Sequence, residues 1–199
     1  MAKTKILLHS CCAPCSTAVI ERLAENYDIT ILYYNPNIYP EQEYFKRKNE
    51  EIKYIEHLNK TSPEIQISML DCDYDNITFY NAVKGLENER EGGARCAVCF
   101  AVRLKRTAEV AKEKQFEMFG TTLSVSPHKN SELINNIGLG IEKELKIKYL
   151  VSNFKKQDGY KRSVELSKEN NLYRQNYCGC KYALEIQRKE APESLTKNY

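Results

Sequence analysis

The chain contains eight cysteines, and their grouping is the first sign of chemistry. They fall into four groups: Cys11, Cys12 and Cys15; Cys72; Cys96 and Cys99; and Cys178 and Cys180. In the reducing cytoplasm, where the bulk properties below place the chain, clustered cysteines bind metal or perform redox chemistry more often than they form disulfides. Cysteines that only fill a core have no reason to fall into pairs. The groups therefore predict a metal or redox centre, with the lone Cys72 the weakest member.

Two of these groups together offer four thiolates. Cys96 and Cys99 have the C-x-x-C spacing that lets two thiolates reach one ion or cluster. They lie where a helix is expected to begin, and the free N–H groups and dipole of a helix N-terminus stabilise thiolates. Cys11 and Cys12, which follow a buried strand, supply the second pair.

Adjacent cysteines help to choose between zinc and iron. Structural zinc prefers two chelating pairs, and the side chains of neighbouring residues diverge too far to make one. An iron–sulfur cube spreads its iron corners, so Cys11 and Cys12 can each take a different corner. We therefore favour a [4Fe–4S] cluster held by Cys11, Cys12, Cys96 and Cys99. A zinc site in which Cys11 and Cys15 join Cys96 and Cys99 is the alternative.

The remaining cysteines predict further redox or metal chemistry. Cys178 and Cys180 flank a glycine, whose freedom permits the small strained ring of a C-x-C disulfide. Strained disulfides are labile, so we predict a dithiol that cycles during turnover, with metal ligation as the alternative. Cys15 is left over, either as a ligand of a second metal together with a carboxylate such as Asp71 or Asp73, or as a free thiol.

Bulk properties limit the class of protein. The 199 residues, 42% hydrophobic and 29% charged, suit one soluble globular domain spanning residues 1–199. No stretch approaches the roughly 18 apolar residues of a membrane span, and the first apolar run is too short for a secretory signal. We expect a cytoplasmic protein without a membrane partner. The net charge of +3, the basic stretches 103–114 and 155–162 and the 14 tyrosines suit RNA, although solvated helix faces and core tyrosines explain them as well.

Strand-like and helix-like segments alternate along the chain. We expect strands at 5–10, 28–34, 64–70, 116–123 and 149–154, and helices at 16–26, 97–114, 131–146, 161–170, from 40 and from 182. Ser16 is the expected N-cap of the first helix, and Phe45 and Ile55 are expected on the apolar face of the second. This alternation predicts an α/β fold, a mostly parallel sheet with helices on both faces and a cysteine-containing helical segment at the C-terminus.

Binding sites in such sheets lie beyond the carboxyl ends of the strands. Polar segments follow each expected strand at this rim. The first holds the cysteines of 11–15, the third holds Asp71, Cys72 and Asp73, and the fourth holds His128 and Lys129. The fold thus predicts that these groups gather at one edge.

Five motifs in sequence order, HSCCAPCS, YYNPNIYPEQEY, EGGARCAVCFAVRL, GTTLSVSPHKN and YCGCKYAL, resemble those of the QueH-type epoxyqueuosine reductases over about residues 7–184. The resemblance implies a Rossmann-like layer similar to the adenine-nucleotide α-hydrolases. It also implies cobalamin-independent reduction of epoxyqueuosine to queuosine in tRNA, the last step of queuosine biosynthesis, with an iron–sulfur cluster.

The resemblance also assigns roles to the cysteines. Cys11 with Cys12, and Cys96 with Cys99, match the cluster ligands, while Cys178 and Cys180 match the redox-active pair. Removing an epoxide oxygen needs two electrons and two protons, so an external electron donor is implied, and an adjacent metal ion such as iron could accept the oxygen. Cys15 and Asp71 are the candidate ligands of that second metal.

Two other functions compete with this interpretation. An iron–sulfur tRNA thiolation enzyme on a similar fold activates the base with ATP and needs a glycine-rich phosphate loop after the first strand. HSCCAPCS stands in that place without a glycine, which argues against ATP use. The other alternative is a zinc-binding module that only docks RNA.

Overall fold

A computed structural model describes residues 3–190 and has a five-stranded parallel sheet at its centre. The strands are β1 (Thr4–Ser10), β2 (Tyr27–Tyr33), β3 (Ser68–Asp71), β4 (Met118–Thr121) and β5 (Lys148–Tyr149), in the order β3-β2-β1-β4-β5. The chain order reverses beside β1, so the crevice between the ends of β1 and β4 is the point where open α/β sheets bind ligands. This confirms the predicted fold class. Residues 1–2 and 191–199 of the expected single domain lie outside the described part.

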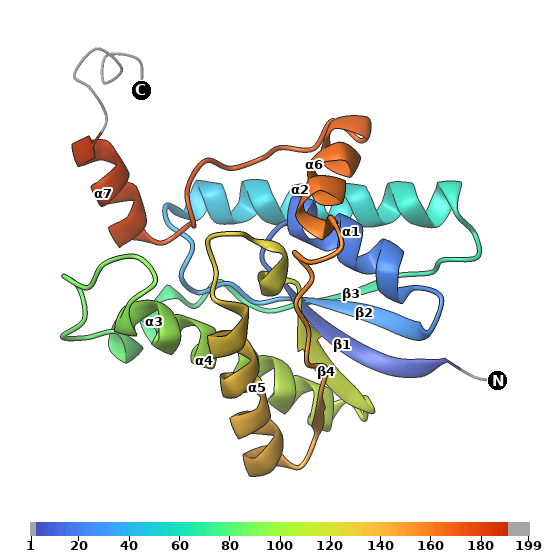
Figure 1. The fold of residues 1–199 in the computed structure, drawn as a ribbon, viewed down its shortest axis with the longest axis horizontal. Helices are drawn as coiled ribbons and strands as arrows, with labels where there is room; N and C mark the ends of the chain where they lie inside the picture. Colours follow the sequence, from blue (N-terminus) through green and yellow to red (C-terminus); the bar gives the residue numbers. More distant parts are fainter. Residues whose placement is uncertain (1–2, 191–199) are drawn as a thin grey trace.

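Helices cover both faces of the sheet (Figure 1). They are α1 (Ala13–Leu23), α2 (Glu41–Thr61), α3 (Asn76–Ala82), α4 (Ala94–Glu113), α5 (Ser131–Leu145), α6 (Gly159–Glu169) and α7 (Lys181–Glu190). Helices α1, α2 and α6 lie on one face, and α4 and α5 on the other. Within the described residues, no helix has the length and apolar character needed to cross a membrane.

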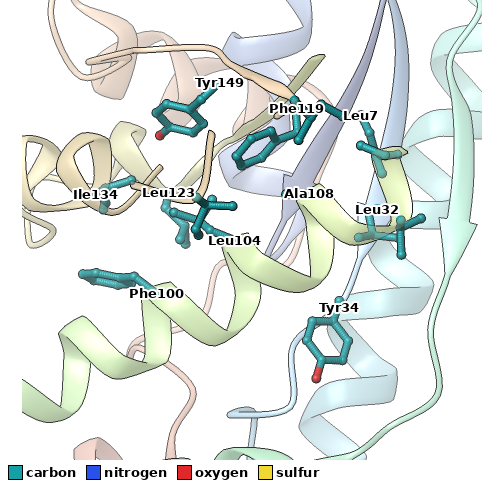
Figure 2. Packing of buried hydrophobic residues seen from close by; sticks show 14 of the residues in the cluster. Leu7, Leu32, Tyr34, Phe100, Leu104, Ala108, Phe119, Leu123, Ile134 and Tyr149 are labelled. Atoms are coloured by element: carbon teal, nitrogen blue, oxygen red, sulfur yellow. The ribbon is translucent and has the colours of Figure 1, made fainter. Parts of the chain in front are cut away.

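The central strand β1 divides the core into two layers. Ile6 and Leu8 point to the α1 and α2 side, and Leu7 between them points to the α4 and α5 side. On the latter side, Leu7 packs in one cluster with Leu104 of α4 and Phe119 of β4 (Figure 2). Strands buried on both faces read as continuous apolar runs, which is why the central strands were predictable.

Helix α1 begins earlier than predicted. Its first residue is Ala13, Cys12 occupies the N-cap position and Pro14 lies in the first turn, where its fixed φ suits a helix. Ser16 is therefore inside the helix, not its N-cap, and its hydroxyl contacts the carbonyl of Cys12 at 3.4 Å. The earlier start places Cys15 in the first turn, directly beside Cys12.

The buried face of α2 also differs from the prediction. Ile55 is buried as expected, but Phe45 is 44% exposed. The buried positions of the N-terminal half are Tyr44, Arg47 and Glu51, because this half packs against polar loops as well as against the sheet.

Further differences from the prediction concern α3, α4 and β5. Helix α4 starts at Ala94, so Cys96 lies within its first turn, and α3 was not predicted. Strand β5 is shorter than expected at Lys148–Tyr149, although the N–H of Leu150 still bonds the carbonyl of Phe119 at 2.8 Å.

Two glycines of α5 allow a matched test of this packing. A Cβ on Gly138 would overlap the ring of Tyr149, whereas a Cβ on Gly140 would meet nothing within 4 Å. We expect Gly138→Ala to destabilise the fold by ~1–3 kcal/mol through overpacking. Gly140→Ala is expected to stabilise it by ~0.5–1 kcal/mol through its helix propensity. Denaturant unfolding of both variants measures this, and equal effects would contradict the packing described.

Candidate functional site

Three thiols meet in the turn between β1 and α1. The sulfur atoms of Cys11, Cys12 and Cys15 lie within 4.8 Å of one another, and those of Cys11 and Cys12 are 3.8 Å apart. Cys11 and Cys12 are buried and Cys15 is half-buried. Among the described residues, no other group of three or more His, Cys, Asp or Glu side chains has its ligand atoms this close. The group has the soft donors that bind iron–sulfur clusters, zinc or other thiophilic metals.

The three thiols shift one another's pKa values. Hydrogen bonds from the thiols of Cys12 and Cys15 hold the pKa of Cys11 well below its usual value. The same contacts act in the opposite sense on the donors: the bond to Cys11 raises the pKa of Cys12 to about 12, and that of Cys15 also rises. Cys11 is therefore the first thiolate, and a bound metal would have to displace the other two protons.

A buried hydrogen-bond network of Ser10, Ser16 and Glu51 supports this turn. The hydroxyl of Ser10 lies 2.7 Å from that of Ser16, accepts the N–H of Cys12 at 3.3 Å and donates to a carboxyl oxygen of Glu51 at 3.0 Å. Glu51 lies on α2 and is completely buried. Burial raises its pKa to about 7, with the hydroxyls of Ser16 and Ser10 opposing the rise.

The second cysteine pair lies at the start of α4. The N–H of Gly92 donates to the sulfur of Cys96 at 3.2 Å. Cys99, one turn further, is buried, and burial raises its pKa to about 12. Cys96 and Cys178 line the same small cavity, together with Phe100 and Lys129.

Cys178 lies beside both the Cys11–Cys15 turn and Cys96 of α4. It belongs to the segment 171–180 that connects α6 to α7. A solvent-connected cavity of about 550 Å³ has Cys178 in its wall, with Cys11 and Cys15 on the same lining. Cys180 is buried and packs with Cys99 and with Ala183 of α7. The structure thus brings six of the predicted cysteines, with Cys15, into one region at the carboxyl end of β1.

Buried cations surround these thiols. Arg103 of α4 is 2% exposed and donates to the carbonyl of Cys99 at 3.2 Å, yet one of its terminal nitrogens has no hydrogen-bond partner. No carboxylate of the described residues pairs with it, whereas the thiols of Cys99, Cys178 and Cys11 keep its pKa high against the effect of burial.

Lys129, which is half-buried in the loop before α5, is a second cation beside these thiols. Burial alone would lower its pKa, but Cys178, Cys11 and Cys15 raise it above its usual value. Unpaired buried cations are costly unless negative charge faces them. The donor set and these cations fit an anionic thiolate-bound cluster.

Asp71 is not brought to Cys15. It ends β3, pairs with Lys48 and lines a separate cavity of about 800 Å³ with Cys72 and Asp73. His9 is also structural. It is buried, its pKa is lowered to about 3 by burial and by Arg103, and its ring bonds Thr121 and the carbonyl of Tyr34, both at 3.1 Å.

The predicted basic stretches are less free than their composition indicates. Arg103 is internal, Lys105 pairs with Glu144 at 2.8 Å, and Arg162 pairs with Glu21 at 2.8 Å. The residues around the cysteines that the sequence did not indicate are Arg103, Gln175, Arg47 and Glu51. For α2, the one available signal was the spacing of Glu43, Arg47 and Glu51, four residues apart on the face that also carries Tyr44 and Tyr54.

The raised pKa of Glu51 gives a pH-dependent prediction. Between pH about 4.5 and 7 the folded chain keeps this proton and the unfolded chain loses it, so wild-type stability falls as pH rises through that window. Glu51→Gln removes this loss and should therefore gain stability relative to wild type, by ~3 kcal/mol between pH 5 and pH 8. Urea unfolding at both pH values tests this. The control is Glu56→Gln, on the exposed side of the same helix, and a gain that does not change with pH would contradict the assignment.

Comparison with known proteins identifies the family. The family model for epoxyqueuosine reductase QueH matches residues 6–186. A curated epoxyqueuosine reductase QueH of Streptococcus pyogenes serotype M1 is 46% identical over 186 residues, covering 93% of this chain and 72% of the relative. The QueH of Staphylococcus epidermidis is 42% identical over 184 residues, covering 91% and 76%.

A solved structure is similar in fold. It is a predicted subunit of a tRNA methyltransferase from Methanocaldococcus jannaschii, with a TM-score of 0.50 and 14% identity, over 83% of this chain and 74% of that one. This likeness supports the α/β architecture alone. The family match, in contrast, extends through the thiol turn, the α4 pair and the 171–180 segment. The chain belongs to the QueH epoxyqueuosine reductase family and is an oxidoreductase.

Proposed function

We propose that this protein reduces epoxyqueuosine to queuosine in tRNA, the last step of queuosine biosynthesis. The observation that carries the proposal is the cavity of about 550 Å³, in whose wall Cys11 and Cys15 of one element lie with Cys178 of another. A cavity of this size suits a modified nucleobase that leaves its stack. The family match supports the same substrate.

Cys11, Cys12, Cys96 and Cys99 are the proposed ligands of a [4Fe–4S] cluster. When bound, such a cluster supplies single electrons, and a neighbouring metal ion such as iron supplies a Lewis acid for the epoxide oxygen. Cys15 is the thiol left for that second metal. Asp71 is less suited to share it, because Asp71 lines a different cavity.

The C-x-C pair supplies a balanced source of reducing equivalents. Oxidation of the Cys178 and Cys180 thiols to a disulfide releases two electrons and two protons. Conversion of an epoxide to an alkene and water consumes the same two electrons and two protons. An external electron donor then returns the disulfide to the dithiol.

The rim of the cavity offers groups that suit RNA. Tyr160, 39% exposed, presents a ring for stacking, with the Arg174 guanidinium 5.9 Å from its centroid. His128 and Lys129 line the same cavity. Since Arg162 is engaged by acidic side chains, we assign phosphate contacts to this rim and to Lys155 and Lys156 rather than to Arg162. With tRNA as the substrate, we propose that the reaction takes place in the cytoplasm.

The reaction itself is the direct test. Anaerobically purified protein is incubated with tRNA containing epoxyqueuosine and a reductant, and the nucleosides are analysed by mass spectrometry. The expected product is lighter by one oxygen atom. Unchanged epoxyqueuosine, with a protein that contains zinc and no iron, would favour the RNA-docking alternative.

Cysteine variants separate the two proposed roles. Changing Cys11, Cys12, Cys96 or Cys99 to alanine should abolish the broad visible absorption of an iron–sulfur cluster, because each removes a thiolate ligand. Cys178→Ala should keep that absorption and lower turnover by ~10³-fold or more, as expected for a residue of the reacting set. Cys72→Ser serves as the control and should keep both. Full absorption in the Cys96 and Cys99 variants would contradict the ligand assignment.

A further inference from the structure

The inner face of α2 carries a charged residue where a core residue is expected. Arg47 is 1% exposed, and each of its three guanidinium nitrogens has a partner. Its Nε donates to Glu43 at 2.7 Å, and its terminal nitrogens donate to the carbonyls of Cys178 at 3.3 Å and Tyr177 at 3.4 Å. A planar fork of donors suits two neighbouring carbonyls, and a lysine cannot reproduce it.

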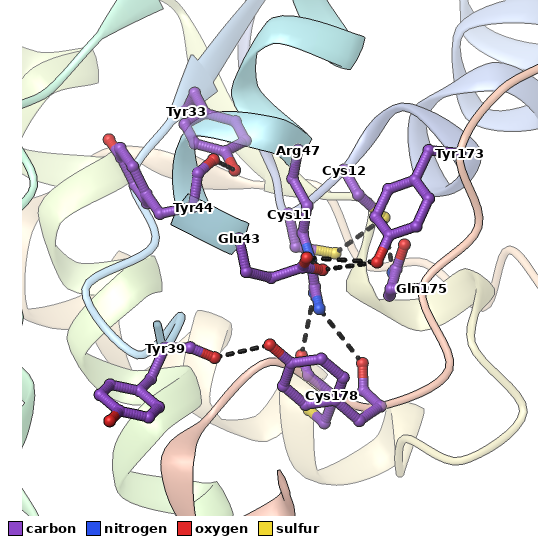
Figure 3. A network of polar contacts seen from close by, with 11 residues as sticks. Cys11, Cys12, Tyr33, Tyr39, Glu43, Tyr44, Arg47, Tyr173, Gln175 and Cys178 are labelled. Carbon is purple, nitrogen blue, oxygen red and sulfur yellow. Dashed lines mark hydrogen bonds and ion pairs between the residues drawn. The ribbon is translucent and has the colours of Figure 1, made fainter. Parts of the chain in front are cut away.

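The segment 171–180 is held along its length against α2 and its N-terminal loop (Figure 3). The hydroxyl of Tyr173 donates to Glu43 at 3.1 Å, and that of Tyr177 donates to the carbonyl of Tyr39 at 2.6 Å. The N–H of Tyr39 donates to the carbonyl of Gly179 at 2.8 Å. Arg47 lies at the centre of these contacts.

The same guanidinium also faces the thiol turn. Burial alone would lower the pKa of Arg47, but Cys12 and Glu43 raise it above its usual value. The amide of Gln175 donates to the sulfur of Cys12 at 3.0 Å, so the segment touches the turn directly as well. Arg47 therefore stands between the first cysteine pair and the carbonyl of Cys178.

Gly179 shows how closely the guanidinium approaches. Its φ is +117°, and a Cβ there would lie 3.0 Å from a terminal nitrogen of Arg47 and 3.2 Å from Ile38. A Cβ at this distance is closer than ordinary van der Waals contact, so the Arg47 side chain would have to shift slightly to admit it.

We propose that Arg47 is a positioning residue that fixes Cys178 beside the Cys11–Cys12 turn by gripping the carbonyls of Tyr177 and Cys178. This inference rests on the proposed role of Cys178 in the reduction of epoxyqueuosine. Arg47 is not itself among the residues that line the cavity, so its effect on the reaction passes through Cys178, which is among them.

Replacement of the Arg47 guanidinium tests the proposal. In Arg47→Lys and Arg47→Gln, kcat should fall ~10-fold and ~10²-fold, because misplacing a reacting group costs rate rather than binding. The KM for tRNA and the visible absorption per protein should stay within about twofold of wild type. The matched control is Arg22→Lys: Arg22 donates to two loop carbonyls, of Lys156 and Gln157, at 3.2 and 3.3 Å, away from the cysteines.

A second readout does not depend on turnover. Alkylation of Cys178 by iodoacetamide in the anaerobic holoprotein, followed by peptide mass spectrometry, should become at least ~5-fold faster in both Arg47 variants, because the released segment opens more often. Arg22→Lys should alkylate at the wild-type rate. If the wild-type protein leaves epoxyqueuosine unreduced, the proposed function is wrong. The alkylation rates still test whether Arg47 positions Cys178.

Two results would overturn the proposal. One is an unchanged kcat together with an unchanged alkylation rate in Arg47→Gln. The other is a loss of activity that only follows a loss of absorption and of folded protein, which would make Arg47 a general stabilising residue. Gly179→Ala allows a double-mutant cycle. The fold-decrease in kcat of the variant that carries both Gly179→Ala and Arg47→Gln should be clearly less than the product of the fold-decreases in the two single variants. Independent, multiplicative effects would contradict the contact.

Discussion

Negative charge on thiols inside a low-dielectric interior is the constraint on which the site depends. Three sulfur atoms within 4.8 Å of one another cannot all ionise unless cations or a metal offset them. Three cations from three different elements offset this negative charge: Arg47 of α2, Arg103 of α4 and Lys129 from the loop before α5. The packing of these helices therefore brings positive charge to the thiols as well as burying apolar surface.

The sheet and the helices that contribute apolar stripes were predictable, because their patterns are local. Strands such as β1 read as apolar runs, and the stripe of α4 has a regular helical period. The first turn of α1 was predicted too late, because Ser16 looks like a better cap than Cys12. The inner face of α2 was misread for another reason: Arg47 and Glu51 are polar types that normally mark the solvent side of a helix.

For the site, residue type and spacing singled out the cysteines, and the structure brings most of them into one region. Their partners were not accessible in this way. Arg103 and Gln175 reach the cysteines only through contacts between distant segments, and no local pattern distinguishes a buried arginine from an exposed one. The prediction for Asp71 failed for a different reason. Asp71 and Cys15 follow strands that end at the same edge of the sheet, yet they line different cavities.

The position of β1 in the sheet has a consequence for how the chain folds during its synthesis. β1 precedes the other four strands in this chain and is the middle strand of the sheet, flanked by β2 and, much later in the chain, by β4. A chain emerging from the ribosome can pair β1 with β2 while the edge that receives β4 is still open. During that interval the thiols of Cys11, Cys12 and Cys15 lack the wall that α4 and β4 provide. Oxidants and stray metals therefore reach these thiols more readily before α4 and β4 close over the turn than in the folded protein.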